Sequence, residues 1–541
     1  MEIAINLMGG LGLFLYGMNL MGDGLQKSAG SKLKRIIELL TSNVIMGVIV
    51  GALVTAIIQS SSATTVMVVG FVNAGIMTLP QAIGVIMGAN IGTTMTAQLV
   101  SFDLVGMAPA ALGIGIVFYL FSSKPKVKTA AEILIGFGIL FTGMEFMKDA
   151  VKPLAEFQGF TDAIVSFSHQ PILGVLLGFG ITAIIQSSSA SMGMLLALAS
   201  QGLIPLSAAL PILYGDNIGT CVTSLLSSIG ASKNARRAAT MHLVFNVIGT
   251  IIFMLILTKP ITMIVTNWNP NDVSRQIANS HTLFNIINVM ILLPFSKLIV
   301  KLTMKLVPEK EDEIEERKTV KYIDERMMET PSIALSNTVK ETLRMGEKAK
   351  KAFVNSMDGL FEKSEVKVKK SFEEEKKVNE LQTIILNYLL KLSKTSLNNE
   401  SRESVDALFN TVNDIERIGD HAENIAELTE IIFEKDLKLS KEGTAELTQM
   451  YKKVVDTYTY ALQAMENSDI DLACKVIKME EQVDMMEKVC RENHMRRLND
   501  NSCTVDNGVV FLDIITNLER ISDHAVNIAQ QVIKAGNKSI A

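Results

Sequence analysis

Long apolar stretches separated by short polar ones fill the first 308 residues of the chain. A membrane-spanning helix needs about 20 mostly apolar residues, and seven stretches reach that length. They lie at roughly residues 3–22, 79–102, 104–121, 130–151, 203–229, 238–258 and 281–306. The first stretch lacks a basic start and a small-residue cleavage site, so it is interpreted as a retained transmembrane helix. The pattern predicts an all-α polytopic membrane domain.

Two further apolar stretches, roughly residues 44–74 and 171–201, carry polar residues near their middle. Both contain the same nine residues, TAIIQSSSA, at 55–63 and at 182–190. Polar groups and non-helical backbone at that depth are tolerated only inside protein or along a watery cavity. Each stretch is therefore predicted to form a re-entrant hairpin of two half-length helices that meet at QSSS.

A second motif repeats at the same spacing as the first. Gly88–Thr93 reads GANIGT and Gly215–Thr220 reads GDNIGT, 127 residues later, as Gln186 follows Gln59 by 127. Basic clusters, placed on the inner side of the membrane, give the first helices of the two units opposite directions. This indicates an inverted-topology repeat of about residues 1–123 and 124–306, with the site near the midplane.

Charge divides the chain into two parts. Residues 1–308 hold 17 Lys and Arg against 11 Asp and Glu, whereas the remainder holds 34 against 45. The sequence thus predicts a membrane domain at 1–308, a charged linker at 309–330 and a soluble domain at 331–541. The basic clusters place the N-terminus outside and the C-terminal domain in the cytoplasm. No strongly basic region indicates nucleic acid, and the four cysteines have no metal-ligand spacing.

The two QSSS motifs offer hydroxyls and amides without charge. A helix broken at QSSS or at NIGT presents free backbone N–H groups at one end, which favour an anion, while carbonyls at the other end favour Na⁺. No Lys or Arg lies in the core of either hairpin, which argues against an arginine clamp. The alternative is that these small residues only let membrane helices pack closely.

Other polar residues in the membrane part have two interpretations each. Asp216, where the first unit has Ala89, is a candidate cation ligand or proton carrier, or else an acid that reaches the interface. Glu145 is a weaker candidate of the same kind. The sequences from His242 to Asn246 and from His281 to Asn285 resemble each other and place His and Asn on one helix face; they either flank the site or pack helices together.

The paired QSSS, GANIGTT and GDNIGT motifs resemble the sodium–phosphate cotransporter family, which includes the animal type II carriers, over about residues 1–306. The resemblance implies sodium-coupled symport of inorganic phosphate across the plasma membrane, with lipid as the surroundings. Implied substrate-binding residues are Gln59, Ser60, Ser61, Ser62, Gln186, Ser187, Ser188, Ser189, Asn90, Thr93, Asn217 and Thr220. Sodium candidates are Gln59, Ser62, Thr93, Gln186, Ser189, Asp216 and Thr220. Departures are Asp216 and Cys221, where the first unit has Thr94.

The soluble part is helical in pattern and also duplicated. Glu416 and Asp420 recur 103 residues later as Glu519 and Asp523 within a longer shared sequence. Each repeat is long enough for three helices, which predicts a six-helix, two-bundle domain. Two acids at i and i+4 share a helix face, and with His421 and His524 nearby they bind a metal, or else they are surface charges paired with arginines.

This pattern resembles the PhoU family over about residues 331–535. The resemblance implies that Glu416, Asp420, Glu519 and Asp523 bind a divalent or iron metal and that the domain regulates transport. Two other functions stay open: a membrane phosphate sensor without transport, and a symporter of another oxyanion. An enzyme is disfavoured, because the sequence has no Ser-His-Asp order, P-loop or zinc signature. Homo-oligomerisation is allowed but not specified.

Overall fold

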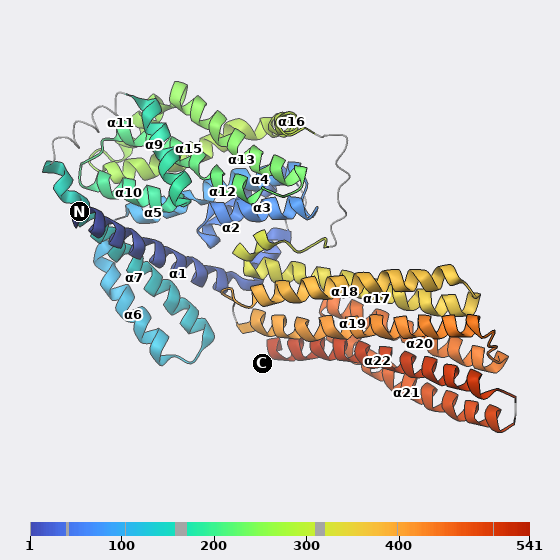
Figure 1. The fold of residues 1–541 in the computed structure, drawn as a ribbon. Helices are drawn as coiled ribbons and strands as arrows, with labels where there is room; N and C mark the ends of the chain where they lie inside the picture. Colours follow the sequence, from blue (N-terminus) through green and yellow to red (C-terminus); the bar gives the residue numbers. More distant parts are fainter. Residues whose placement is uncertain are drawn as a thin grey trace. The chain divides into compact units, whose positions relative to one another are not determined.

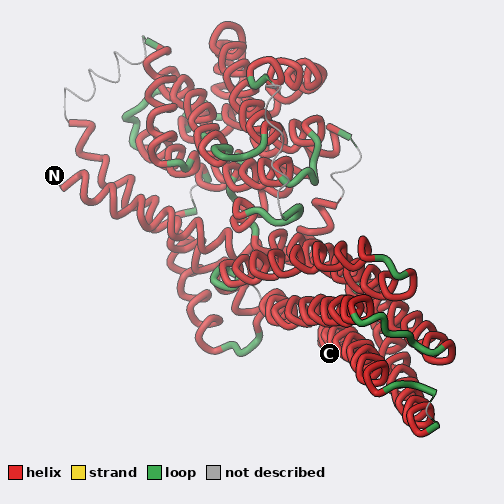
Figure 2. The backbone as a smooth tube through the Cα atoms, turned by 45° about the vertical axis from the view of Figure 1, so that its right-hand side comes forward, coloured by secondary structure: helices red, strands yellow, loops and turns green. Residues whose placement is uncertain are grey.

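The computed structural model describes residues 2–38, 43–102, 104–156, 170–308, 320–397, 399–500 and 502–540 (Figure 1). These residues form helices and loops, with no strand among them (Figure 2). The all-α expectation is therefore confirmed. Two compact units divide the chain: residues 1–314 with 324–333, and residues 315–323 with 334–541. Part of the expected linker, residues 309–319, lies outside the described residues.

The first unit consists of a few long helices and of several runs of short ones (Figure 1). They are α1 (Glu2–Glu38), α2 (Val44–Ile58), α3 (Ser61–Asn73), α4 (Leu79–Gly92), α5 (Thr94–Ser101), α6 (Ala108–Phe121), α7 (Pro125–Val151), α9 (Pro171–Ile185), α10 (Ser188–Ser200), α11 (Leu206–Gly219), α12 (Cys221–Ser227), α13 (Lys233–Ile252), α14 (Thr258–Trp268), α15 (Val273–Leu292) and α16 (Ser296–Leu306).

Five helical stretches of the described chain are long and apolar enough to cross a membrane. They are Glu2–Ala29, Leu79–Ser101, Pro125–Leu154, Lys233–Trp268 and Val273–Leu306. The expectation of seven was too high by this measure. The stretch 104–121 begins with a 3₁₀ turn and leaves only 14 residues for α6. The stretch 203–229, which contains α11 and α12, is not among these five.

Both QSSS sequences interrupt a helix, as expected. Gln59 has φ of 60° and Gln186 has φ of 56°, the left-handed conformation that ends a helix. Ser60 and Ser187 then cap the following helices, because their hydroxyls accept hydrogen bonds from the amides of Ala63 at 3.1 Å and of the equivalent Ala190 at 3.2 Å. The motif therefore encodes a helix end and a helix start in adjacent residues.

The NIGT sequences do not interrupt the helix in this way. Thr93 has φ −63° and ψ −21°, and Thr220 has φ −60° and ψ −24°, all of them helical values. The expectation that a break at NIGT would free backbone N–H groups was wrong. Helical angles at the joint keep α5 and α12 running on from α4 and α11, so these N–H groups face carbonyls of the preceding turn.

Helices α1 and α7 pack antiparallel through glycines. Gly10 lies against Gly143, and Gly17 lies against Gly136. With a repeat length of 126 residues, Gly136 is the equivalent of Gly10 and Gly143 is the equivalent of Gly17. Each contact therefore joins the same two repeat positions, with the roles of the repeats exchanged. Two copies related by a twofold axis would make such a pair of contacts. Because glycine has no side chain, the two backbones can approach closely. Such close approach favours the packing of apolar helices in lipid.

Replacing Gly17 with alanine is expected to loosen this contact. A Cβ on Gly17 would overlap the backbone nitrogen of Leu140, so one helix must shift, at a cost of about 1–3 kcal/mol. The measurement is the melting temperature of the detergent-purified protein. Gly12→Ala is the matched control, because nothing lies within 4 Å of a Cβ at that position. Equal melting temperatures for the two variants would contradict the assigned contact.

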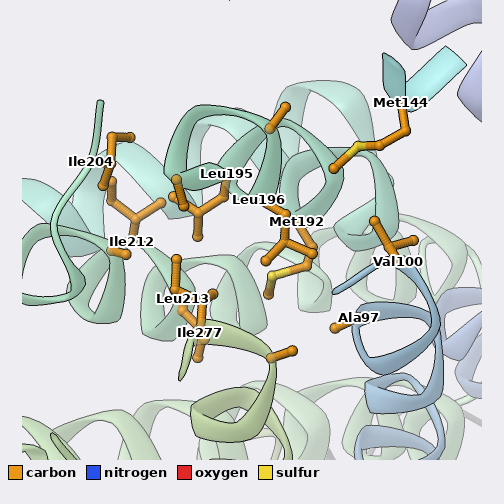
Figure 3. Close-up of a cluster of buried hydrophobic side chains, with 14 of the residues drawn as sticks. Ala97, Val100, Met144, Met192, Leu195, Leu196, Ile204, Ile212, Leu213 and Ile277 are labelled. Carbon is orange, nitrogen blue, oxygen red and sulfur yellow. The ribbon is translucent and has the colours of Figure 1, made fainter. Parts of the chain in front are cut away.

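The apolar core of the first unit combines both repeats. Ala97 and Val100 on α5 lie beside Met192 and Leu195 on α10, and all four are at most 5 % exposed (Figure 3). Met144 on α7 joins the same cluster. The half-length helix that follows the second QSSS is thus fixed against a helix of the first repeat, which brings the two halves of the site together.

The second unit contains six long helices in its described residues. They are α17 (Pro331–Glu362), α18 (Glu365–Leu392), α19 (Asn399–Glu434), α20 (Lys441–Asn467), α21 (Ile470–Asn499) and α22 (Val505–Ile540). Helices α19 and α22, which carry the repeated acidic motif, pack against each other. Helix α18 packs on α19 as its equivalent α21 packs on α22, and α20 packs on α21 and α22. Their buried stripes, such as Ile415 and Ile514, hold the unit together.

Candidate functional site

One pocket of the first unit is lined by both QSSS motifs and has a volume of about 510 Å³. Its walls come from α1, from the two helix breaks and from a segment that follows the last helix of the unit. The lining residues are Leu15, Met18, Asn19, Gly22, Asp23, Gln26, Ile58, Gln59, Ser60, Ser61, Ser62, Ala63, Ile185, Gln186, Ser187, Ser188, Ser189 and Glu329. All eight residues expected from the two QSSS motifs are therefore brought together.

The pocket wall contains two helix N-termini. Helix α3 begins at Ser61 and helix α10 begins at Ser188, and both residues line the pocket. The first N–H groups of a helix have no partner within the helix and carry the positive end of its dipole. Ser60 and Ser187 satisfy one amide each as caps, which leaves the other amides and the neighbouring hydroxyls to a ligand. Such a surface favours an anion.

The side chain of Gln59 is held by contacts outside its own motif. Its amide nitrogen donates to the backbone oxygen of Ala56, and its amide oxygen accepts from the hydroxyl of Thr96 at 3.0 Å. Thr96 lies on α5 and was not found by sequence reasoning, because it stands outside both repeated motifs. The hydrogen bond fixes which face of the Gln59 amide is available to the pocket.

The NIGT residues lie elsewhere. Asn90, Thr93, Asn217 and Thr220 are buried, but none is among the described residues that line the pocket. Asn90 instead donates to the amide oxygen of Asn246 on α13, at 3.0 Å. The hydroxyl of Thr220 donates to the backbone oxygen of Asn217, at 2.8 Å. Asn90 thus contacts a neighbouring helix and Thr220 contacts the preceding turn of its own chain, and neither has a place in the pocket.

The two conspicuous acids of the membrane part are also outside the pocket. Asp216 is 3 % exposed and accepts a hydrogen bond from the hydroxyl of Thr182. In the first repeat the equivalent Thr55 donates to Thr64 at 2.9 Å instead. Glu145 is exposed. The equivalent position on α1, Asn19, does line the pocket.

The repeated His and Asn positions contact other helices. His242 approaches Asn90 at 3.4 Å through one ring nitrogen and Ser224 at 3.2 Å through the other. Asn246 donates to the carbonyl of His242 at 3.1 Å. These contacts are those of polar interhelical packing, the second interpretation of the motif. On α15, His281 is likewise buried.

The second unit contains an acidic cluster between α21 and α22. Oxygen atoms of Glu480, Asp484 and Asp523 lie within 4.8 Å of one another, the one such group among the described residues. Burial, and then the charge of Asp484, raise the pKa of Glu480 to about 7. Burial also raises the pKa of Asp523 and that of Glu519 above their ordinary values. The three carboxylates offer only oxygen ligands, and their negative charges repel one another. Such a group fits a hard cation such as Mg²⁺ or Mn²⁺.

The equivalent place in the first repeat differs by one residue. Glu375 corresponds to Glu480, and Asn379 stands where the second repeat has Asp484, both 105 residues earlier. Burial and the charges of Glu423 and Asp420 raise the pKa of Glu375 to about 7. Of the four expected metal ligands, only Asp523 belongs to the three-acid cluster found among the described residues. Glu480 and Asp484 were missed, although they have the same four-residue spacing as the motif that was recognised.

The histidines of the repeated motif do not join the acidic cluster. The Nδ1 atom of His421 lies 2.9 Å from the side-chain oxygen of Asn517, and that of His524 lies 2.9 Å from an oxygen of Asp414. Both contacts cross between α19 and α22, and the two rings stack with centroids 5.6 Å apart. The histidines therefore tie the two repeats together, contrary to the suggestion that they complete a metal site.

The long apolar helices and the paired helix breaks are those of a helical membrane protein with an internal repeat. The model of the Na⁺/Pi-cotransporter family matches residues 13–149 and again 142–268, and the PhoU domain model matches residues 342–429 and 447–532. The chain belongs to the Na⁺/Pi-cotransporter family and carries two PhoU domain repeats at its C-terminal end. Both family resemblances are confirmed.

Several relatives are similar over most of their length. YjbB of Salmonella typhimurium, a protein named for inorganic phosphate export, is 24% identical over 537 residues, which cover 98% of this chain and 97% of YjbB. YqeW of Bacillus subtilis, an uncharacterised protein, is 32% identical over 297 residues, or 55% of this chain and 96% of YqeW. The crystal structure of PhoU from Pseudomonas aeruginosa aligns at 23% identity and a TM-score of 0.36, covering 38% of this chain and 97% of that one.

Proposed function

We propose that this protein is a sodium-coupled transporter of inorganic phosphate, and that the pocket between the two QSSS motifs is its phosphate site. The observation that supports this most directly is the convergence of two helix N-termini, at Ser61 and Ser188, on one pocket. Phosphate is an oxyanion that accepts several hydrogen bonds at once. Amides and hydroxyls from two directions can supply them without a buried arginine.

Sodium would supply the compensating positive charge. No Lys or Arg is among the described residues that line the pocket, so a phosphate bound there alone would leave negative charge uncompensated. Hydroxyl, amide and carboxylate oxygens bind Na⁺, and Ser62, Ser189 and Asp23 line the same pocket. The pocket volume of about 510 Å³ is many times that needed by one water molecule, so there is room for phosphate with Na⁺ and hydration water.

The asymmetry of the pocket supports a transport cycle. Helix α1 contributes six lining residues, whereas the described residues of its repeat partner α7 contribute none. An inverted repeat can exchange the roles of its halves, so the opposite opening would be lined by α7, at positions such as Glu145 and Asp149. We propose, from the basic clusters, that the N-terminus lies outside and the second unit lies in the cytoplasm.

The name of one relative bears on the direction of net flux. A relative similar over nearly its whole length is named for phosphate export, whereas the resemblance to animal carriers implies uptake. The cycle is reversible in principle, and the sodium and phosphate gradients decide its direction. Export is therefore the second candidate for this same site.

The proposed function is tested with purified protein in proteoliposomes and ³²P-phosphate. Flux is expected only when sodium is present, and it should reverse when the sodium gradient is reversed. Sulfate and arsenate serve as competing anions. Saturable phosphate binding without flux under either gradient would instead identify a sensor, and sodium-independent flux would contradict the coupling.

The acidic cluster of the second unit supports a metal-dependent regulatory role. We propose that Glu480, Asp484 and Asp523 hold a divalent cation, which would offset the burial and the repulsion that raise the pKa values of Glu480 and Asp523. Glu519 lies one turn before Asp523 on α22 and shares this environment. A bound cation would hold α21 and α22 together, and this unit would then regulate the transporter to which it is joined.

A further inference from the structure

A short segment between the last membrane helix and the second unit is docked on the first unit. Residues 324–333 belong to the first unit and form a 3₁₀ turn at Glu325–Glu329. Asn73, at the end of α3, donates to the carboxylate of Asp324. Met327 is completely buried beside Gly70 of the same helix. Composition alone predicts a charged linker here, but the structure shows a fitted contact.

Arg326 provides the second anchor of this segment. Its guanidinium donates to the backbone oxygens of Ser227 and Ile229, at the C-terminal end of α12, and forms an ion pair with Asp324 at 2.7 Å. The last carbonyls of a helix have no partner within the helix and attract a cation. The segment is thus held to α3 by Asp324 and to α12 by Arg326, one helix from each repeat.

The end of this docked segment reaches the substrate pocket. Among the described residues that line the pocket, Glu329 is the one that comes from outside α1 and the two QSSS breaks. Glu329 is exposed and lines a pocket whose helix N-termini favour an anion. A negative charge there competes with an incoming oxyanion, both by repulsion and by attracting the same positive dipoles.

The segment is also continuous with the second unit. Helix α17 begins at Pro331, two residues after Glu329, and from Ala334 onward it belongs to the second unit. A helix transmits a displacement along its axis with little loss. A displacement at the start of α17 would therefore act on Glu329, two residues before it in the chain.

We propose that residues 324–333 form a displaceable cover of the QSSS pocket, in which the docked Glu329 carboxylate opposes phosphate binding. This inference rests on the proposed function of the pocket. It assigns a regulatory contact to a stretch that neither family model matches. Because binding and docking are coupled, phosphate must weaken docking by the same factor by which docking weakens phosphate binding.

The first test measures the KM for phosphate in proteoliposomes. Glu329→Gln keeps the shape of the side chain and removes its charge, and we expect the KM to fall about fivefold, the order of effect of one nearby charge at a pocket mouth. Glu325→Gln is the matched control, because Glu325 is in the same turn but does not line the pocket. An unchanged or higher KM in Glu329→Gln overturns the proposal.

The second test detects the segment itself, by trypsin cleavage after Arg326 in the full-length protein in detergent. Met327→Ala removes the buried side chain without placing a charge beside the cleaved bond, so faster cleavage and a lower KM are expected. Inorganic phosphate should accelerate cleavage of the wild type, and should do so less in Glu329→Gln. Cleavage that is independent of phosphate in the wild type overturns the coupling. A wild type that shows no sodium-dependent flux refutes the proposed function instead, which separates the two failures.

Discussion

Replacing Gln59 and Gln186 together with alanine is expected to reduce sodium-dependent phosphate flux at least about 30-fold in kcat/KM. Both residues line the pocket, one from each repeat. A lost hydrogen bond to a desolvated or charged group costs about 1–3 kcal/mol, and two such losses add to at least about 2 kcal/mol. If the two glutamines contribute equally, each single variant is expected to lower kcat/KM by a factor equal to the square root of the factor for the double variant.

The backbone conformation requires a specific control. Both glutamines have left-handed φ values, near 60° and 56°, which glycine adopts without strain. Gln59→Gly with Gln186→Gly therefore removes the same side chains and relaxes the backbone, and it should lose as much flux as the alanine pair. Normal flux in the glycine pair would show that the amides are not ligands. Gln170→Ala, at an exposed helix start outside the pocket, should be neutral.

The same variants test which ion each amide contacts. Sodium dependence and phosphate dependence are measured separately at saturating levels of the other ion. If the Gln59 amide contacts phosphate, its loss raises the KM for phosphate more than that for sodium. The panel of sulfate and arsenate adds selectivity, since neutral donors discriminate oxyanions by size and protonation. A variant that shifts only the sodium dependence would reassign the residue to the cation.

Exchanging one residue between the acidic clusters of the second unit is expected to move the metal site from one repeat to the other. Asp484→Asn gives the second cluster the composition of the first, and Asn379→Asp gives the first cluster the composition of the second. Removing one of three carboxylate ligands should abolish tight binding of Mn²⁺ at the second cluster. The carboxylate that Asn379→Asp introduces beside Glu375 should create a new Mn²⁺ site near Glu416 and Asp420.

The measurement is Mn²⁺ titration of the full-length protein by calorimetry, with the melting temperature of the second unit as a separate readout. At a metal concentration about 100 times the dissociation constant, binding stabilises the folded state by about 2.7 kcal/mol, or roughly 5–10 °C for a unit of this size. The wild type and Asn379→Asp should show this shift, and Asp484→Asn should not. A full shift in Asp484→Asn would contradict the assigned ligands.

Sequence determined the local features of the site. The hydroxyls of Ser60 and Ser187 can cap a helix only if the preceding residue turns the chain, and both breaks are present where QSSS predicted them. The helical pattern of the second unit and its two acidic motifs could also be predicted from the sequence. Amphipathic periodicity and duplication are local properties of the chain. These features depend on residues a few positions apart.

Tertiary structure alone decided which side chains share the pocket. Asn90 lies within a repeated motif and Thr96 lies just after it, yet Asn90 faces α13 and Thr96 holds Gln59. The difference is a rotation of one helix about its axis, which hydropathy does not encode. Likewise, Asp484 joins Asp523 only because α21 and α22 pack together, although each acid has the same spacing within its own helix.

The segment at 324–333 shows the same division most clearly. Its charged composition predicts a solvated linker, and composition is all that the sequence provides there. The docked arrangement depends on a cavity for Met327 beside Gly70 and on helix-end carbonyls for Arg326, which exist only after α3 and α12 have packed. The sequence by itself thus determined the helices, the breaks and the duplicated chemistry. Packing between distant segments decided which of those groups meet, because burial and helix rotation are set by the whole unit.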